Sequence, residues 1–259
     1  SIEHGHSASF TQTQYGGRIV VTKAMRMFDR YAQIEEVEKD NVQFAFDRVD
    51  QSQADLILNG FTGTSYTDIY GATQSNVTAD AVVLFSASHT NNQTSATARN
   101  LIRNAAGTAN PALDRAAIVT ARKDARINRD PNGANRPVTL DRLVVSATNE
   151  DLAERTVYSS GVAGTPNVDL NPLKGKISNI LVWSRLDTRG NDSTDTSAYW
   201  FLADSRLVKK TLKSPFAQKP MMYAPAQVDD SKNWEYTIDS FYVLGLLWQF
   251  GIWGSTGAN

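Results

Sequence analysis

The residues best suited to chemistry are two serines and a histidine close together in the sequence, Ser86, Ser88 and His89. A serine hydroxyl becomes a useful nucleophile when an imidazole accepts its proton. Such pairs are recognised by their geometry in space, and residues this close in sequence rarely adopt it. The nearest approach to a G-x-S-x-G turn, residues 63–67 (GTSYT), has no second glycine. A Ser–His hydrolase is therefore only the enzymatic alternative, and a structural histidine is the preferred interpretation.

A second pair of chemically capable residues, His4 and His6, would share one face of an extended chain. Two imidazoles without a third ligand nearby make a weak metal site. The chain has no cysteine and 3 histidines, which excludes disulfides, thiol nucleophiles and thiolate metal sites. We expect no metal, no cofactor and no catalytic residue.

Basic side chains gather in two places. The first group is Arg122, Lys123, Arg126 and Arg129, and the second is Lys209, Lys210 and Lys213. Basic clusters without interleaved aromatic residues are usually solvated faces, although they can also meet an acidic neighbour or a nucleic-acid backbone. Because the whole chain has a formal net charge of -1, it lacks the field that would gather nucleic acid.

The elements that must position these residues belong to a globular chain. Its 259 residues, 41% of them hydrophobic, suffice for one large domain or two small ones with a sizeable core. The last apolar run, residues 241–253, is interrupted by Gly245, Gln249 and Gly251 and is shorter than the roughly 20 residues that span a bilayer. We expect no membrane partner.

The strongest helical signal runs from Ile34 to Asn59. Its apolar positions recur at steps of three and four, and the helix would be about 38 Å long. Thr22 is a suitable N-cap for a short helix over residues 23–31. A second helix is predicted from Asn110-Pro111 to Ile127, and a third from a capping box at Thr148 and Asp151 to Tyr158.

Strands are predicted between these helices, and the combination indicates an α+β fold. The predicted strands are residues 17–21, 81–85, 140–147, 177–186, 199–203, 207–212 and 234–238. Residues 214–233, with three prolines, are predicted to be irregular, and residues 61–79 and 188–197 to be loops. No active site emerges. A polar N-terminal stretch (residues 1–17), an over-long helix and polar loops are typical of a chain that completes its burial against copies of itself.

The order of several segments resembles that of the Mu-like prophage major head subunits, within the tailed-phage major capsid proteins. The segments are Arg18 to Met25 (RIVVTKAM), the long helix, Leu84 to Asn91 (LFSASHTN), Pro137 to Val145 (PVTLDRLVV) and Ala198 to Asp204 (AYWFLAD). The similarity extends from about Tyr15 to the end of the chain. It rests on the ordered set of segments, because no single motif is diagnostic.

The resemblance implies a capsid fold with a peripheral domain, an axial domain and an extended loop. Residues 1–21 would form the returning limb of the extended loop and a strand, and residues 22–138 the peripheral domain, with a spine helix at 34–59. Residues 139–197 would form the axial domain, with tips near 159–167 and 188–197. Residues 198–259 would return to the peripheral domain as C-terminal strands, and residues 224–233 would be a loop that meets neighbours.

The function implied is that of a head protein in the virion, assembled in the host cytoplasm. Its copies would form the pentamers and hexamers of an icosahedral shell around double-stranded DNA, which it would contact non-specifically. Portal, scaffold or decoration proteins would be further partners. Members of the family usually carry an arm and an outgoing loop limb before residue 1, so we expect an upstream segment outside the numbered chain. An encapsulin-like nanocompartment shell and a receptor-binding or adhesive protein are alternatives, and the long helix argues against the latter.

The resemblance and the charge pattern together predict where subunits touch. Residues 1–17 should lie on a neighbouring subunit, and acidic residues of the spine helix should meet Arg or Lys of neighbours. The predicted inter-subunit contacts are His4, His6, Phe10, Tyr15, Glu35, Glu38, Asp47, Asp229, Asp230 and Lys232.

Overall fold

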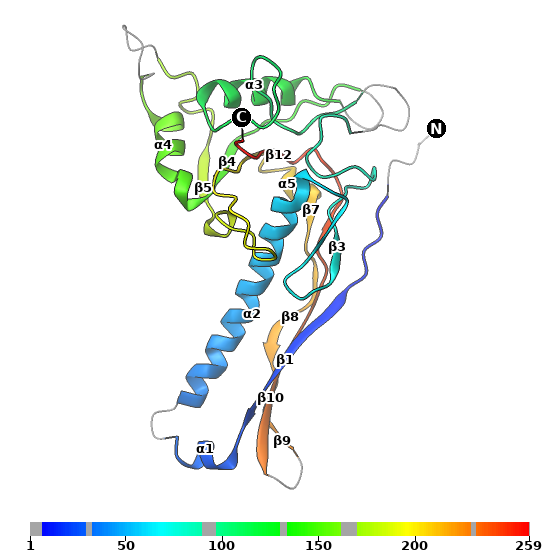
Figure 1. The fold of residues 1–259 in the computed structure, drawn as a ribbon, viewed down its shortest axis with the longest axis vertical. Helices are drawn as coiled ribbons and strands as arrows, with labels where there is room; N and C mark the ends of the chain where they lie inside the picture. The colour runs from blue at the N-terminus through cyan, green and yellow to red at the C-terminus, as the bar shows by residue number, and fades with distance from the viewer. Residues whose placement is uncertain are drawn as a thin grey trace. The chain divides into compact units, whose positions relative to one another are not determined.

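The computed structural model describes residues 7–29, 33–89, 97–129, 134–161, 170–228 and 232–258. The chain divides into two compact units (Figure 1). The core unit comprises Ser1–Ala8, Ala54–Lys213 and Gly245–Asn259, and the strand unit comprises Ser9–Gln53 and Ser214–Leu244. Both helices and sheets are present, as the predicted α+β class requires.

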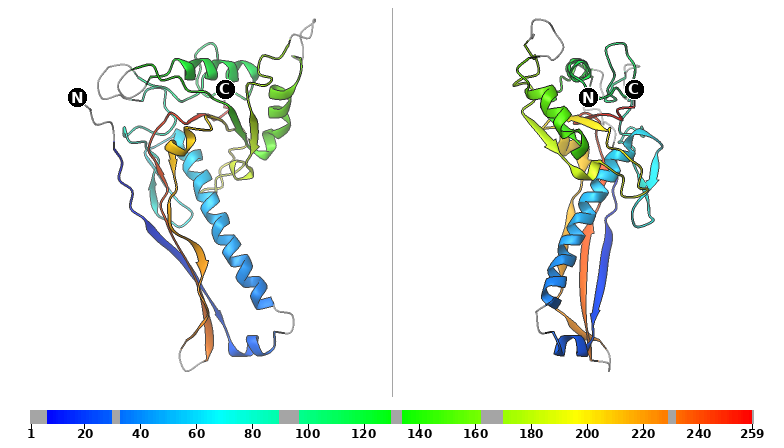
Figure 2. Two further views of the ribbon diagram at one scale, coloured as in Figure 1. Left: turned by 180° about the vertical axis from the view of Figure 1, so that it is seen from behind. Right: turned by 60° about the vertical axis from the view of Figure 1, so that its left-hand side comes forward.

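A sheet with β10 (Asn233–Tyr242) at its centre forms the strand unit. On one side β10 pairs antiparallel with β1 (Thr13–Val21), and on the other with β8 (Phe216–Met222) and β9 (Ala226–Val228). Figure 2 shows these strands from two further sides. Tyr236, Ile238, Ser240 and Tyr242 are buried and alternate with more exposed neighbours, and the strand predicted over residues 234–238 is confirmed.

One prediction for the strand unit is wrong. Residues 214–233 contain β8 and β9 and are not irregular, and Pro220 fits because β8 is an edge strand whose proline need not donate to a partner. Residues 13–17 belong to β1 and pair with β10 of the same chain, and their predicted contact with a neighbouring subunit stays a prediction.

The helices of the strand unit agree closely with the sequence pattern. Helix α1 (Lys23–Met27) is shorter than predicted, and the Thr22 hydroxyl caps it by accepting the Met25 N–H at 3.2 Å. Helix α2 (Gln33–Leu58) matches the predicted long helix to within one residue at each end. Its residues up to Gln53 belong to the strand unit, and those from Ala54 belong to the core unit.

In the core unit, a four-stranded sheet has the order β12 (Ile252–Ser255), β6 (Trp200–Ala203), β4 (Arg142–Val145) and β5 (Asn179–Val182). Helices α3 (Arg115–Arg126) and α4 (Glu150–Tyr158) share one apolar cluster with this sheet (Figure 1). Trp200 and Leu202 of β6 join that cluster. Phe201, which points to the opposite face, packs against Phe61 and Phe85, so both faces of β6 are buried.

Close packing on the second face of the sheet explains a glycine in β12. A Cβ atom added to Gly254 would lie 2.8 Å from ring atoms of both Phe61 and Phe85. Real Cβ atoms do not approach other carbon atoms so closely, so only glycine fits here without displacing the aromatic rings. The sheet and these rings therefore form one tightly packed layer.

Shorter elements complete the core unit. They are the hairpin β2 (Ser65–Thr67) and β3 (Thr73–Ser75), the pair β7 (Leu212–Lys213) and β11 (Gly245–Leu246), helix α5 (Val208–Thr211), and the 3₁₀ turns η1 (Asn59–Phe61), η2 (Ala147–Asn149) and η3 (Ser184–Leu186). Among the described residues, no helix is both long and apolar enough to cross a membrane.

Several sequence predictions in the core unit are wrong. Residues 81–85 make only a single bridge at Val83, residues 208–211 are helical, and the loop predicted at 61–79 contains the β2–β3 hairpin. Helix α3 begins at Arg115, because Asp114 caps it by accepting the Ala117 N–H. The capping box before α4 is absent, because the Thr148 hydroxyl donates to Asp187.

Candidate subunit-contact surfaces

His89, the strongest candidate for catalysis, lies in a buried polar cluster. Its side chain has 0% exposure, and its Nδ1 lies 2.9 Å from the Asp80 carboxylate. Its Nε2 lies 3.0 Å from Asn100 Oδ1 and 3.1 Å from the Leu84 carbonyl. Asn100 in turn donates to the carbonyls of Leu84, Gln249 and Ile252. The cluster therefore ties the segment before His89 to the C-terminal residues of the core unit.

The hydrogen bonds fix the chemical roles in this cluster. Asn100 Oδ1 accepts the Ser86 N–H, so its amide orientation is set and both ring nitrogens of His89 face acceptors. Burial raises the pKa of the Asp80 carboxyl, but hydrogen bonds from His89 and Thr78 lower it more, and the net pKa lies below its ordinary value. The Ser86 hydroxyl accepts the Ser88 N–H instead of approaching the imidazole.

The structure places only some of the predicted contact residues. Phe10 is exposed ahead of β1, and Tyr15 lies within β1, where its ring stacks on Tyr242 at 4.5 Å. Asp47 accepts a hydrogen bond from Gln43 within α2, and Lys232 is exposed at a left-handed turn with φ +55°. His4, His6, Asp229, Asp230 and the side chains of Glu35 and Glu38 lie outside the described residues.

The strand unit has exposed apolar side chains that were not predicted from the sequence. Met25, Met27 and Phe28 gather on and just after α1, and Phe28 is 73% exposed. On α2, Phe44 is 54% exposed. Phe44 lies outside the apolar stripe predicted for the long helix. Its position off the stripe could have predicted that its side chain is exposed.

The loop at residues 188–197, which was expected to be a tip of the axial domain, is anchored to the end of α2. The Gly190 N–H donates to Asp55 at 2.7 Å, and the Asn59 side chain donates to Asn191 at 3.3 Å. The Arg189 guanidinium reaches the Leu58 carbonyl at 3.5 Å. The loop therefore hydrogen-bonds to the C-terminal end of the helix, and its predicted place as a tip of the axial domain stays a prediction.

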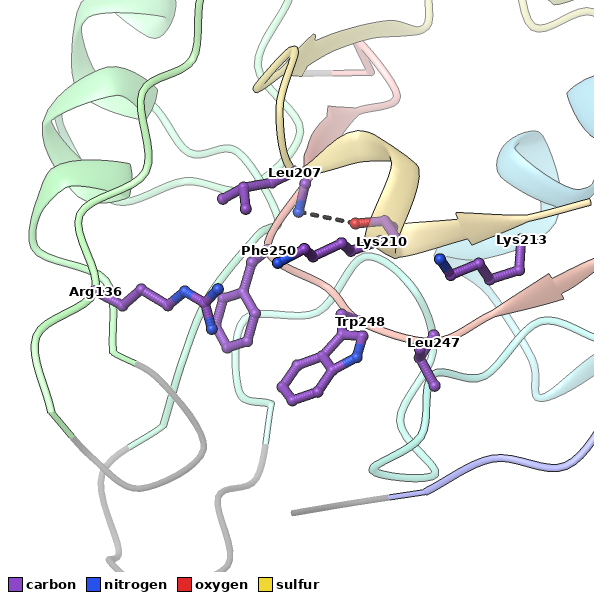
Figure 3. A pocket seen from close by; sticks show the side chains of 9 residues that line it. Arg136, Leu207, Lys210, Lys213, Leu247, Trp248 and Phe250 are labelled. Atoms are coloured by element: carbon purple, nitrogen blue, oxygen red, sulfur yellow. Dashed lines mark hydrogen bonds between the residues drawn. The ribbon is translucent and has the colours of Figure 1, made fainter. Parts of the chain in front are cut away.

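A pocket of about 320 Å³ lies in the core unit beside α5 (Figure 3). Arg136, Lys210 and Lys213 supply its charged lining, and Leu207, Leu247, Trp248 and Phe250 supply its apolar lining. The Arg136 guanidinium lies 5.2 Å from the centre of the Phe250 ring, and the ring centres of Trp248 and Phe250 are 5.9 Å apart. The sequence flagged Lys210 and Lys213 but could not connect them with aromatic residues almost forty positions later.

Solved phage structures share this arrangement of elements. The capsid of Myoviridae Phage XM1 matches with a TM-score of 0.53 and 10% sequence identity, over 96% of this chain and 74% of that chain. The head structure of Helicobacter pylori bacteriophage KHP40 matches with a TM-score of 0.51 and 10% identity, over 96% of this chain and 76% of that chain. The chain has the tailed-phage major capsid protein fold.

This capsid fold is the one that the resemblance implied. No protein-family model matches the chain, and no curated protein matches its sequence. Both of these structures are phage heads. Among the described residues, no three His, Asp or Glu side chains come together as a metal site.

Proposed function

We propose that this chain is a major capsid protein of a tailed phage, whose copies form the hexamers and pentamers of an icosahedral shell around double-stranded DNA. The observation that carries the proposal is the match over 96% of the chain to the capsid of Myoviridae Phage XM1. Because one fold can serve several functions, the proposal also needs support from the surface of the molecule.

The exposed apolar residues of the strand unit provide this support. Met25, Met27 and Phe28 are each more than half exposed, and they follow one another around one short helix. Gathered apolar surface of this kind marks contact sites in soluble proteins. In a shell, each subunit makes repeated heterologous contacts that close by rotation, and such contacts would cover this surface.

We propose the finer assignments on the resemblance alone. The chain would be a Mu-like head subunit, with a peripheral domain at 22–138, an axial domain at 139–197 and returning strands at 198–259, and residues 1–21 would end an extended loop. Portal, scaffold or decoration proteins would be partners in the virion, after assembly in the host cytoplasm. Contact with packaged DNA would be non-specific, in keeping with the net charge of -1.

Sedimentation and negative-stain electron microscopy of the purified protein test the proposal. We expect closed particles or capsomer rings, and a protein that stays monomeric at high concentration would contradict the proposal. Particles from the native source should protect double-stranded DNA from nuclease. Particles that enclose protein cargo and no DNA would instead support the encapsulin-like alternative.

A substitution experiment separates the shell from the Ser–His hydrolase. The variants Ser86→Ala and Ser88→Ala remove both candidate nucleophiles from a region whose histidine is already engaged. We expect normal particles and no loss of any esterase activity that the preparation shows. Variants that still form particles but lose the esterase activity would favour the hydrolase.

A further inference from the structure

The pocket beside α5 carries positive charge that nothing in the described part of the chain neutralises. Among the described residues, no carboxylate pairs with Arg136, Lys210 or Lys213. Asp204, which precedes α5, is buried, and it accepts the backbone N–H groups of Thr139, Arg206 and Leu207. The pocket therefore suits a ligand that combines negative charge with an apolar body.

We propose that this pocket receives the α2 face formed by Glu36, Asp40 and Phe44 of a second copy of the chain. The ring of Phe44 would enter the apolar hollow, and the carboxylates would meet the cations at its rim. This inference rests on the proposed function, because a shell places copies of the chain side by side.

The shape and lining of the pocket favour a protein side chain over DNA. A hollow of about 320 Å³ accommodates one aromatic side chain, whereas a DNA duplex is a convex rod that presents phosphates. Leu207, Leu247 and Trp248 give the pocket an apolar lining, which would not stabilise a phosphate. In Figure 3 the Lys210 side chain extends toward Phe250, and the Arg136 guanidinium lies beside the same ring, so these two cations lie next to an aromatic residue. Contact sites of this kind, with aromatic anchors and desolvated cations, carry much of the free energy of protein association.

Helix α2 presents the complementary combination. Positions 36, 40 and 44 are four residues apart, so they lie along one face of the helix. Glu36 and Asp40 are exposed, and Phe44 remains 54% exposed although the Arg48 guanidinium lies 4.6 Å from its ring centre. The charges also complement each other more widely, because the strand unit contains more Asp and Glu than Lys and Arg, and the core unit has the reverse balance.

A second acidic and aromatic face exists on α4 and serves as the matched control. Glu150, Glu154 and Tyr158 are also four residues apart, and Tyr158 is exposed. Tyr158 carries a phenolic hydroxyl that needs a hydrogen-bond partner when it is buried, whereas the Phe44 ring does not. The α4 face therefore has the same spacing but is a poorer match to the apolar hollow of the pocket.

Disulfide trapping tests the contact directly, because the chain contains no cysteine of its own. One copy carries Asp40→Cys and another carries Lys213→Cys, and the two are mixed before assembly and mild oxidation. We expect a covalent dimer that contains one copy of each variant. A mixture of Glu154→Cys with Lys213→Cys should give no more than background. The proposal is overturned if the Asp40 pair does not link, or if the Glu154 pair links instead.

Charge reversal supplies an independent measurement. Lys210→Glu with Lys213→Glu, or Glu36→Lys with Asp40→Lys, should each lower the assembled fraction by about tenfold or more, as loss of close interfacial charge pairs does. Combining the four substitutions in one chain should restore most of the assembly. Circular dichroism of each variant verifies that the subunit is folded.

The outcomes distinguish this inference from the proposed function. Shells that assemble normally in the pocket variant would overturn the contact and leave the capsid assignment intact. Shells that assemble but lose DNA would identify the pocket as a nucleic-acid site and would also overturn it. Covalent dimers in a protein that never forms shells would retain the contact and refute the capsid assignment.

Discussion

The core unit and the strand unit differ in how they use their apolar residues. Among the described residues, the core unit buries a continuous cluster that includes Trp200, Leu202 and Trp253. In the described part of the strand unit, few large apolar side chains are buried, chiefly Tyr236, Ile238 and Tyr242 of its central strand. It leaves Met25, Met27, Phe28 and Phe44 exposed to a large extent.

This difference predicts which unit contributes more to the free energy of folding and which contributes more to the free energy of assembly. A unit with its own continuous core gains stability from its own chain, at about 25 cal/mol for each Å² of apolar surface removed from water. A unit that exposes its apolar residues gains little until another surface covers them. We therefore expect core-unit substitutions to act on unfolding and strand-unit substitutions to act on association.

The largest effect is expected from Trp200→Ala. Trp200 is fully buried, and its indole N–H donates to the Pro111 carbonyl at 2.9 Å. Truncation of such a residue costs about 3–5 kcal/mol of unfolding free energy, because it leaves a cavity. Urea denaturation followed by tryptophan fluorescence measures the loss. A loss below about 1 kcal/mol would remove the contrast between the two units.

The next effect concerns the buried pair of Asp80 and His89. We expect Asp80→Asn to cost about 3 kcal/mol at neutral pH, because it leaves the imidazole without its carboxylate. The pKa of Asp80 is lowered in the folded chain, so its contribution is fully present above about pH 3.9, the ordinary value, and is lost as the pH falls through the folded pKa.

Urea unfolding repeated between neutral and acidic pH examines both parts of this prediction. The wild-type chain should lose stability in acid more steeply than Asp80→Asn, because only the wild type has this carboxylate to protonate. Equal slopes for the two proteins would show that the pair does not contribute as described.

A smaller effect is expected from Gly254→Ala in β12. The added methyl group would lie 2.8 Å from Phe61 and Phe85, and over-packing of this kind costs about 1–3 kcal/mol. Thermal unfolding measures the cost. Ser255→Ala in the same strand provides a comparison. It adds no group and instead removes the hydrogen bond of 2.6 Å from the Ser255 hydroxyl to the Pro111 carbonyl. An unchanged melting temperature for Gly254→Ala would mean that the aromatic layer is loosely packed.

The smallest effect on stability is expected from Phe28→Ser in the strand unit. Because the side chain is 73% exposed, the free energy of unfolding should change by no more than about 0.5 kcal/mol. The assembled fraction, measured by sedimentation, should nevertheless fall. A variant that is destabilised but assembles normally would reverse the roles assigned to the two units.

The sequence predicted best those elements whose pattern is local and repeated. The period of α2 and the alternation around Tyr236 each depend on one face of one element, and Thr22 caps α1 by a contact three residues away. The fold family followed from an ordered set of segments, not from any single residue.

Other features depended on partners distant in the sequence and could not be predicted. Leu84 and Phe85 look like a strand but are buried as irregular backbone, held by Asn100 and Gly60. Thr148 has the spacing of a helix cap but donates to Asp187. The pocket joins Arg136, Lys213 and Trp248, which are far apart along the chain. The exposed Phe44 was open to prediction, because it lies off the apolar stripe of α2.

A cryo-electron microscopy reconstruction of particles from the native source tests the central claim most directly. We predict a closed icosahedral shell whose pentamers and hexamers are built from this chain, with density for packaged double-stranded DNA inside. Particles whose shell is built from a different protein, with this chain absent or attached only to the surface, would contradict the account.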